Sequence, residues 1–82
     1  MADDRDALIA TLTEEGWTER WDGQDYVDIA MRRVAECRVW RHGDVDLYGL
    51  ANQWSGTFEE DTPNSVILAA ARAAVEAEGG DR

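Results

Sequence analysis

The chain has 82 residues, of which 44% are hydrophobic and 32% are charged, and its formal net charge at pH 7 is −10. A chain of this length forms one domain, residues 1–82, with a modest core, and its composition excludes a disordered polypeptide. No stretch has the length and apolarity of a transmembrane helix, and residues 1–4 are acidic where a targeting peptide would be basic. We therefore expect a cytoplasmic protein.

The charge is distributed unevenly along the chain. Residues 1–28 carry nine acids and two arginines (−7), residues 29–42 carry one acid and four arginines (+3), and residues 43–82 carry eight acids and two arginines (−6). A negative field repels nucleic acid and lipid headgroups and attracts basic protein surfaces. We therefore expect another protein with a basic surface as partner, and neither nucleic acid nor membrane. Solubility alone would also account for such a charge.

Catalytic and metal-binding chemistry finds little support in the residues present. Cys37 is the only cysteine and His42 the only histidine, which leaves no internal disulfide and no Cys/His zinc ligand set. His42, Asp44 and Asp46 fit a polar turn better than a metal site, because they offer too few ligands. Ser55 lacks the strand–turn–helix context of a nucleophile. We expect no catalytic residue, no metal, no cofactor and a non-enzymatic function.

The first predicted element is a helix over residues 3–15. Asp3 or Asp4 is placed to cap it, and Gly16 is placed to end it. An apolar stripe at helical spacing is formed by Leu8, Ile9 and Leu12.

A period of two then predicts a hairpin at about residues 17–30, with Asp22-Gly23 as a two-residue type I′ turn. This register pairs Glu19 with Tyr26 and Trp17 with Asp28. Two opposite faces result, one with Trp17, Trp21 and Tyr26 and the other with Val27 and Ile29.

Residues 25–37 also fit a helix, because Val27, Met31 and Val34 lie on one helical stripe. We favour the strand, since the Asp22-Gly23 turn needs a second strand to pair with the first.

A second hairpin is predicted at about residues 36–49. A three-residue loop at residues 42–44 segregates the faces better than a two-residue loop. It pairs Val39 with Leu47, Trp40 with Asp46, and Arg38 with Tyr48, the last as a cation–π contact. Cys37, Val39 and Leu47 then face the core, and Trp40 and Tyr48 face the other side.

Residues 53–58 form a possible last strand, because Trp54, Gly56 and Phe58 alternate. A final helix is predicted over residues 63–78, with Thr62 as cap, Pro63 at the first position and Gly79-Gly80 as the stop. The fold class is therefore α+β, in the order α-β-β-β(-β)-α. We expect a small antiparallel sheet whose aliphatic face is covered by both helices.

The aromatic side of this sheet is the candidate partner-binding surface. Trp, Tyr and Arg are enriched at interface hot spots. The predicted binding residues are Trp17, Trp21, Tyr26, Trp40 and Tyr48 with the acids Glu19, Asp28 and Asp46. The alternative is that these rings form the main core beneath the helices.

Two resemblances add expectations about family. The order helix, Gly-aromatic, hairpin, strands, helix is similar to that of HicA-type toxin ribonucleases. The segment matching their catalytic Gly-Ser-His is Gly23-Gln24-Asp25, without histidine, so that activity does not carry over. Residues 54–74, an aromatic strand running through Thr-Pro into an alanine-rich helix, resemble small actinobacterial and actinophage domains of unknown function. This likeness implies a bacterial or phage setting.

Three functions remain open. The leading hypothesis is an acidic interaction module, such as a phage or mobile-element inhibitor that mimics nucleic acid and occupies a basic, nucleic-acid-binding surface of a host protein. The alternative is an assembly subunit that forms a homodimer through its aromatic face. The third is nucleic-acid binding, which requires convergence of Arg32, Arg33, Arg38 and Arg41.

Overall fold

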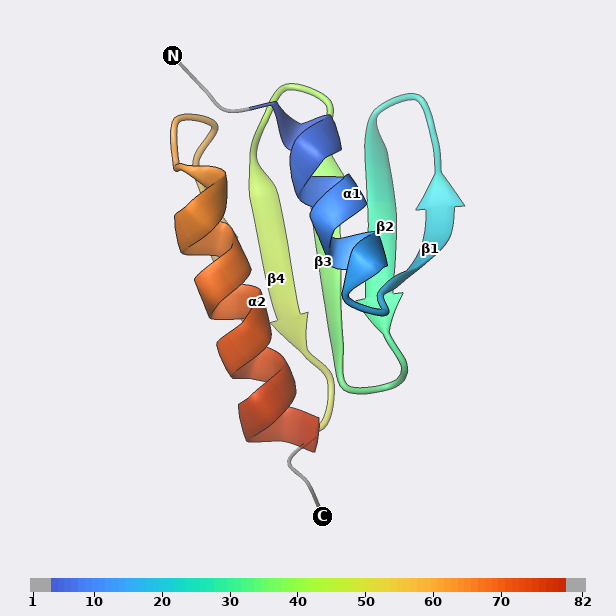
Figure 1. Ribbon diagram of the computed structural model, residues 1–82, viewed down its shortest axis with the longest axis vertical. Coiled ribbons are helices and arrows are strands. Elements are labelled where there is room, and N and C mark those ends of the chain that lie inside the picture. Colours follow the sequence, from blue (N-terminus) through green and yellow to red (C-terminus); the bar gives the residue numbers. More distant parts are fainter. Residues whose placement is uncertain (1–3, 80–82) are drawn as a thin grey trace.

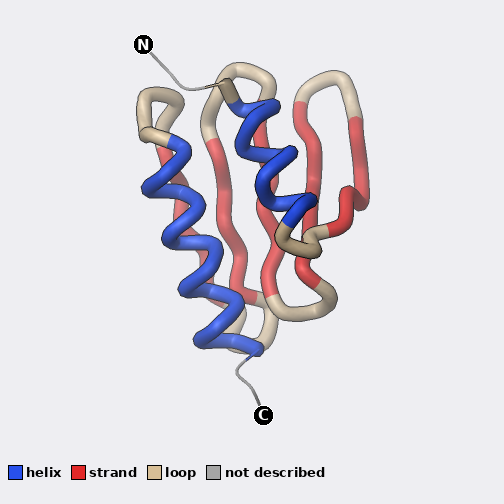
Figure 2. The backbone as a smooth tube through the Cα atoms, in the orientation of Figure 1, coloured by secondary structure: helices blue, strands red, loops and turns tan. Residues whose placement is uncertain are grey.

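The computed structural model describes residues 4–79 as one five-stranded antiparallel sheet with both helices on one of its faces (Figure 1). The elements are α1 (Arg5–Glu14), β1 (Thr18–Asp22), β2 (Tyr26–Met31), β3 (Ala35–Trp40), β4 (Val45–Gly49), β5 (Trp54–Phe58) and α2 (Asn64–Gly79). The strands lie side by side in chain order, each joined to the next by a short loop (Figure 2). The predicted α+β class is confirmed, with the last strand present.

Helix α1 begins and ends where local signals place it. The carboxylate of Asp4 accepts a hydrogen bond of 2.9 Å from the backbone N–H of Asp6, which makes Asp4 the N-cap. Gly16 follows the helix with a φ of +102°, a conformation that glycine adopts without steric cost. The other predicted cap, Asp3, lies outside the described residues.

The first hairpin differs from the predicted register. Trp21 pairs with Asp28 and Glu19 pairs with Ile29, where the prediction paired Glu19 with Tyr26. A β-bulge lies between Glu19 and Trp21 and shifts the register there. A bulge adds one residue to its strand, so the positions on either side of it exchange faces. The predicted two-residue turn is wrong, since Gly23–Asp25 separate the strands and Gly23 does not have a positive φ.

Residues 25–37 contain strand β2, a turn and the start of β3, so the helical alternative is wrong. All six residues of β2 pair with β3, from Tyr26 with Trp40 to Met31 with Ala35. Arg32 lies in the intervening turn with a φ of +47°.

The second hairpin is shifted by two residues from the predicted register. Val39 pairs with Val45 and Arg38 with Asp46, in place of Leu47 and Tyr48. The loop is closed by Trp40 N–H donating to the Asp44 carbonyl at 2.9 Å, and Gly43 adopts a φ of +116°. A shift of two leaves every side chain on its predicted face, because the strand period is two.

Strand β5 pairs regularly with β4 and leads into α2. The helix begins at Asn64, one residue later than predicted, and the Pro63 carbonyl accepts the backbone bonds of Val66 and Ile67. Gly79 is its last residue, and the predicted stop at Gly80 lies outside the described residues.

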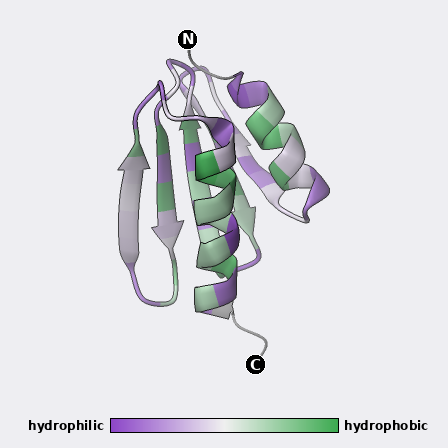
Figure 3. Ribbon diagram, turned by 60° about the vertical axis from the view of Figure 1, so that its left-hand side comes forward, coloured by the Kyte–Doolittle hydropathy of each residue, from purple (hydrophilic) through white to green (hydrophobic). Residues whose placement is uncertain are grey.

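The core lies between the sheet and the two helices, as predicted. Figure 3 shows the apolar side of α2 turned toward the sheet. The buried cluster includes Leu8, Leu12, Trp17, Ile29, Cys37, Val39, Val45, Leu47 and Ile67. Burial raises the pKa of the Cys37 thiol to about 12, so this side chain stays protonated and acts as a small apolar group.

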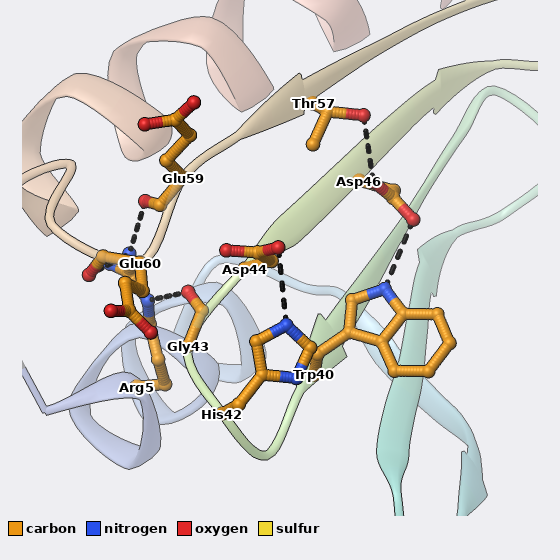
Figure 4. Close-up of polar contacts among 9 residues, drawn as sticks. All are labelled: Arg5, Trp40, His42, Gly43, Asp44, Asp46, Thr57, Glu59 and Glu60. Carbon is orange, nitrogen blue, oxygen red and sulfur yellow. Dashed lines mark hydrogen bonds and ion pairs between the residues drawn. The ribbon is translucent and has the colours of Figure 1, made fainter.

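Arg5 joins three separate parts of the chain at one end of the sheet. Its Nε donates to the Gly43 carbonyl at 2.7 Å, and one of its terminal nitrogens donates to the carbonyls of Glu59 and Glu60 at 3.2 and 3.1 Å (Figure 4). Its other terminal nitrogen donates to the Asn64 side chain at 2.5 Å. The guanidinium thus ties α1 to the β3–β4 loop and to the start of α2.

Candidate functional site

The second face of the sheet is covered by neither helix, and we call it the open face (Figure 3). The strand registers arrange its side chains in three rows across the sheet. These rows are Tyr26–Trp40, then Trp21–Asp28–Arg38–Asp46–Thr57, then Thr18–Ala30–Glu36–Tyr48–Ser55. Each of the three central strands, β2, β3 and β4, therefore contributes at least one aromatic ring and one charged group to this face.

Arg38 occupies the centre of the open face. Its Nε and one terminal nitrogen bond both carboxylate oxygens of Asp28, at 2.9 and 3.3 Å, and its guanidinium lies 4.1 Å from the centroid of the Tyr26 ring. The hydrogen bond with Asp28 raises the pKa of Arg38, so the guanidinium remains charged. The pair fixes both side chains in one orientation on the surface.

Asp46 organises the neighbouring part of the open face. Its carboxylate accepts hydrogen bonds from Trp40 Nε1 at 3.0 Å and from the Thr57 hydroxyl at 2.9 Å (Figure 4). The Tyr48 hydroxyl lies 3.5 Å from the same carboxylate, and burial together with Asp46 raises the pKa of Tyr48. Three strands therefore contribute to one preformed network.

The rings on this face are reachable from solvent to different degrees. Trp21 is 55% exposed, whereas Tyr26, Trp40 and Tyr48 are half-buried. The rings of Tyr26 and Trp40 pack with centroids 5.0 Å apart. Beside Tyr48, the surface is hollowed by about 490 Å³ next to Glu36, Arg38, Ser55 and the end of β4. A protruding side chain of a partner would fit this hollow.

The structure brings together six of the eight predicted binding residues. Trp21, Tyr26, Asp28, Trp40, Asp46 and Tyr48 share the open face. The predicted placement of Trp17 and Glu19 is wrong, because the bulge in β1 exchanges faces. Trp17 is 3% exposed within the core, and Glu19 pairs with Ile29 on the helix side of the sheet.

The polar turn at residues 42–44 is separate from Asp46. The His42 ring nitrogen lies 3.1 Å from Asp44, while Asp46 points onto the open face (Figure 4). Within residues 4–79, no three His, Cys, Asp or Glu side chains gather as a metal ion would require.

The four arginines of the basic middle segment do not converge. Arg32 and Arg33 lie in the β2–β3 turn, and Arg38 pairs with Asp28 in the middle of the sheet. Arg41 follows the other end of β3, where it forms an ion pair of 2.5 Å with Asp22. The requirement for nucleic-acid binding through these four residues is therefore not met.

The sequence did not identify Glu36 and Thr57 as members of the open face. It also did not show that Arg38 forms an ion pair with Asp28. The alternation along β3 does place Glu36, Arg38 and Trp40 on one side. The pairing of Arg38 with Asp28 depends on a register between β2 and β3 that no local pattern defines.

We found no match to this chain among protein-family models, curated proteins or solved structures. The two resemblances therefore remain expectations. Within the part of the chain that is described, neither helix combines the length and the apolarity needed to cross a bilayer.

Proposed function

We propose that this protein is a non-enzymatic interaction module that binds a basic protein surface through its open face. The observation that carries this proposal is the open face itself, a rigid cluster of rings and acids that neither helix covers. Tryptophan, tyrosine and arginine dominate the energetics of protein interfaces, and fixed side chains lose little entropy on binding.

The charge of the chain defines the kind of partner. With a net charge of −10, long-range attraction favours a basic protein and accelerates its approach. At contact, exposed rings and carboxylates both accept guanidinium groups, and the stacking of Arg38 on Tyr26 is an internal example of such contact. We therefore propose that arginine side chains of the partner dock among Trp21, Trp40 and Tyr48.

The mode of binding differs from a continuous imitation of a phosphate backbone. Such imitation needs a row of unpaired carboxylates, whereas Arg38 lies between Asp28 and Asp46 across the three central strands. Asp28 is neutralised by this arginine, and Asp46 holds Trp40 and Thr57. The proposal therefore rests on rings and on a few oriented acids. As its biological setting we propose a phage or mobile-element inhibitor that acts on a host protein.

Titration calorimetry with a synthetic arginine-rich peptide tests this proposal. We expect binding that weakens with salt and that weakens further in the double variant Glu36→Gln and Asp46→Asn. The matched control, Glu59→Gln with Glu60→Gln, removes the same charge from the loop before α2 and should bind as the parent does. Equal weakening in both double variants would show that net charge alone acts, and would overturn the assignment of the open face.

A further inference from the structure

Strand β5 is an edge without the usual protection. Edge strands are normally blunted by charged side chains, proline or a bulge, because their outer backbone groups are free to pair with another chain. At the opposite edge, β1 has a bulge and the charged residues Glu19, Arg20 and Asp22. Strand β5, Trp-Ser-Gly-Thr-Phe, has no charge, no proline and an unbroken register with β4. Figure 3 shows it at the free edge of the sheet, beside α2.

Helix α2 presents a second apolar stripe on the same side of the molecule. Its buried stripe, Ile67, Ala71 and Ala74, packs on the sheet. A separate stripe with the 4-3-4 spacing of a helix–helix contact is formed by Val66, Ala70, Ala73 and Ala77, and Val66 is 48% exposed. The three alanines line a groove of about 410 Å³ that runs along Trp54, Gly56 and Phe58 of β5.

The sequence of β5 is self-complementary. Its residue types are symmetric about Gly56. A hydroxyl residue lies on either side of Gly56, namely Ser55 and Thr57, and an aromatic residue lies at each end of the strand, namely Trp54 and Phe58. In a two-fold interface, if one residue of the first copy contacts a given residue of the second, the reverse contact is also made. Antiparallel pairing of the two β5 strands, centred on Gly56, satisfies this condition. Trp54 would then lie opposite Phe58 of the second copy, a favourable cross-strand pair.

From these three features we infer that a second copy of this chain docks along β5 and α2, extending the sheet to ten strands. Antiparallel pairing of the two β5 strands supplies backbone hydrogen bonds. On the helix side of the sheet, the stripe of Val66, Ala70, Ala73 and Ala77 packs against the same stripe of the second copy. The small side chains allow the two helices to approach closely.

The charge pattern favours a second copy over a basic partner at this edge. The stripe and β5 contain no acid for a basic partner to pair with. Two chains that each carry −10 can approach only where their acids do not meet. In the centred pairing, Glu59 and Glu60 face Gln53 and Asn52 of the second copy, so that like charges are not placed opposite one another.

This interface is distinct from the open face. The two open faces would become neighbours on one continuous sheet, so a partner with two basic patches would gain from bivalent contact. Dimerisation through β5 and partner binding through the open face are therefore separable by mutation.

Sedimentation velocity at micromolar concentrations tests the inference. The parent should sediment at twice the chain mass of 9.2 kDa. Gly56→Lys should be monomeric, because the two lysines would meet at the two-fold axis. Its fold should be retained, since a side chain at this position meets nothing within 4 Å and the φ of Gly56 is not positive. Ala73→Glu, on the exposed stripe of α2, should be monomeric as well.

Two controls separate this interface from the rest of the surface. Thr18→Lys adds the same charge to the opposite edge strand and should remain dimeric, as should Trp40→Ala on the open face. A monomeric parent, or dimers that persist in both Gly56→Lys and Ala73→Glu, would overturn the inference. Loss of the dimer in Trp40→Ala alone would place the contact on the open face instead.

Discussion

Arg5 is the residue that holds the most distant parts of the chain together. It is 8% exposed, and its guanidinium donates to the carbonyls of Gly43, Glu59 and Glu60, which come from two different loops. Hydrogen bonds from a charged donor stabilise more than neutral ones, and buried carbonyls that lose their donor cost free energy. Nothing in the local sequence distinguishes Arg5 from the exposed arginines, so its role depends on tertiary structure.

We expect Arg5→Ala to lower the free energy of unfolding by about 3 kcal/mol, because it leaves the buried Gly43 carbonyl and the part-buried carbonyls of Glu59 and Glu60 without their donor. Arg5→Lys should recover part of this loss, since one ammonium group cannot reach all of the acceptors. Arg20→Ala, the same change at an exposed arginine, should cost less than about 0.5 kcal/mol. Urea denaturation measures all three. Equal stabilities of Arg5→Ala and Arg20→Ala would contradict this role.

Glu78 joins the last turn of α2 to the β4–β5 loop. Its carboxylate accepts hydrogen bonds from Trp54 Nε1 at 2.8 Å and from the backbone and side-chain nitrogens of Asn52 at 3.0 and 2.8 Å. These bonds, with those of Asn52 the larger cause, lower the pKa of Glu78 below its ordinary value. A group whose pKa is lower in the folded state stabilises above its unfolded pKa, and this stability is lost as the pH falls through the folded pKa.

The melting temperature of the parent should therefore fall on acidification below about pH 5, and Glu78→Gln should show a smaller fall. Protonation also relieves repulsion among the many acids, but this effect is nearly the same in both proteins. Glu76→Gln, an exposed position on the same helix, is the control and should keep the parental pH profile. Identical profiles for the parent and Glu78→Gln would contradict a stabilising role for this carboxylate.

At the scale of strands, the alternation of side chains was sufficient to predict which residues of β2, β3 and β4 face the core. Val27, Cys37 and Leu47 lie on the helix side as expected, because one buried face imposes a period of two. The register was not predictable from this pattern. Pairing Val39 with Val45 or with Leu47 buries the same side chains, and the choice depends on how the β3–β4 loop closes.

The bulge in β1 explains the largest error at the candidate site. Trp17, Glu19 and Trp21 follow a perfect alternation in sequence, yet the extra residue at the bulge moves Trp17 and Glu19 to the helix side. The result is physically consistent, since Trp17 then belongs to the buried core cluster. The prediction of an aromatic face remains correct for Tyr26, Trp40 and Tyr48, because these rings come from regularly paired positions of β2, β3 and β4.

Neighbouring residues of β3 test the separation of the two faces. Val39 is 2% exposed in the core, and a carboxylate there would be buried without a partner. Val39→Asp should therefore unfold the domain or cost at least about 4 kcal/mol. Trp40→Ala should cost only about 1 kcal/mol, through its contacts with Tyr26 and Asp46. Thermal melts compare the two, and equal destabilisation would show that the faces are assigned to the wrong sides.

At the scale of the whole molecule, we propose different roles for the two faces of the sheet. The helix side contains the buried core, while neither helix covers the open face. In the proposed function, the negative charge attracts a basic partner at long range, and the oriented rings and acids bind it at contact. The free edge at β5 is a third surface, to which we assign a second copy of the chain.

The four tryptophans report on separate places in this arrangement. Trp21 and Trp40 lie on the open face, Trp17 lies in the core, and Trp54 is bonded to Glu78 on the helix side. Each indole N–H gives its own signal in a nitrogen–proton NMR spectrum, so one titration with the arginine-rich peptide follows all four.

We predict that the Trp21 and Trp40 indole signals move on binding, while those of Trp17 and Trp54 stay in place. Movement of the Trp54 signal with unchanged Trp21 and Trp40 signals would place the partner on the helix side and contradict binding through the open face.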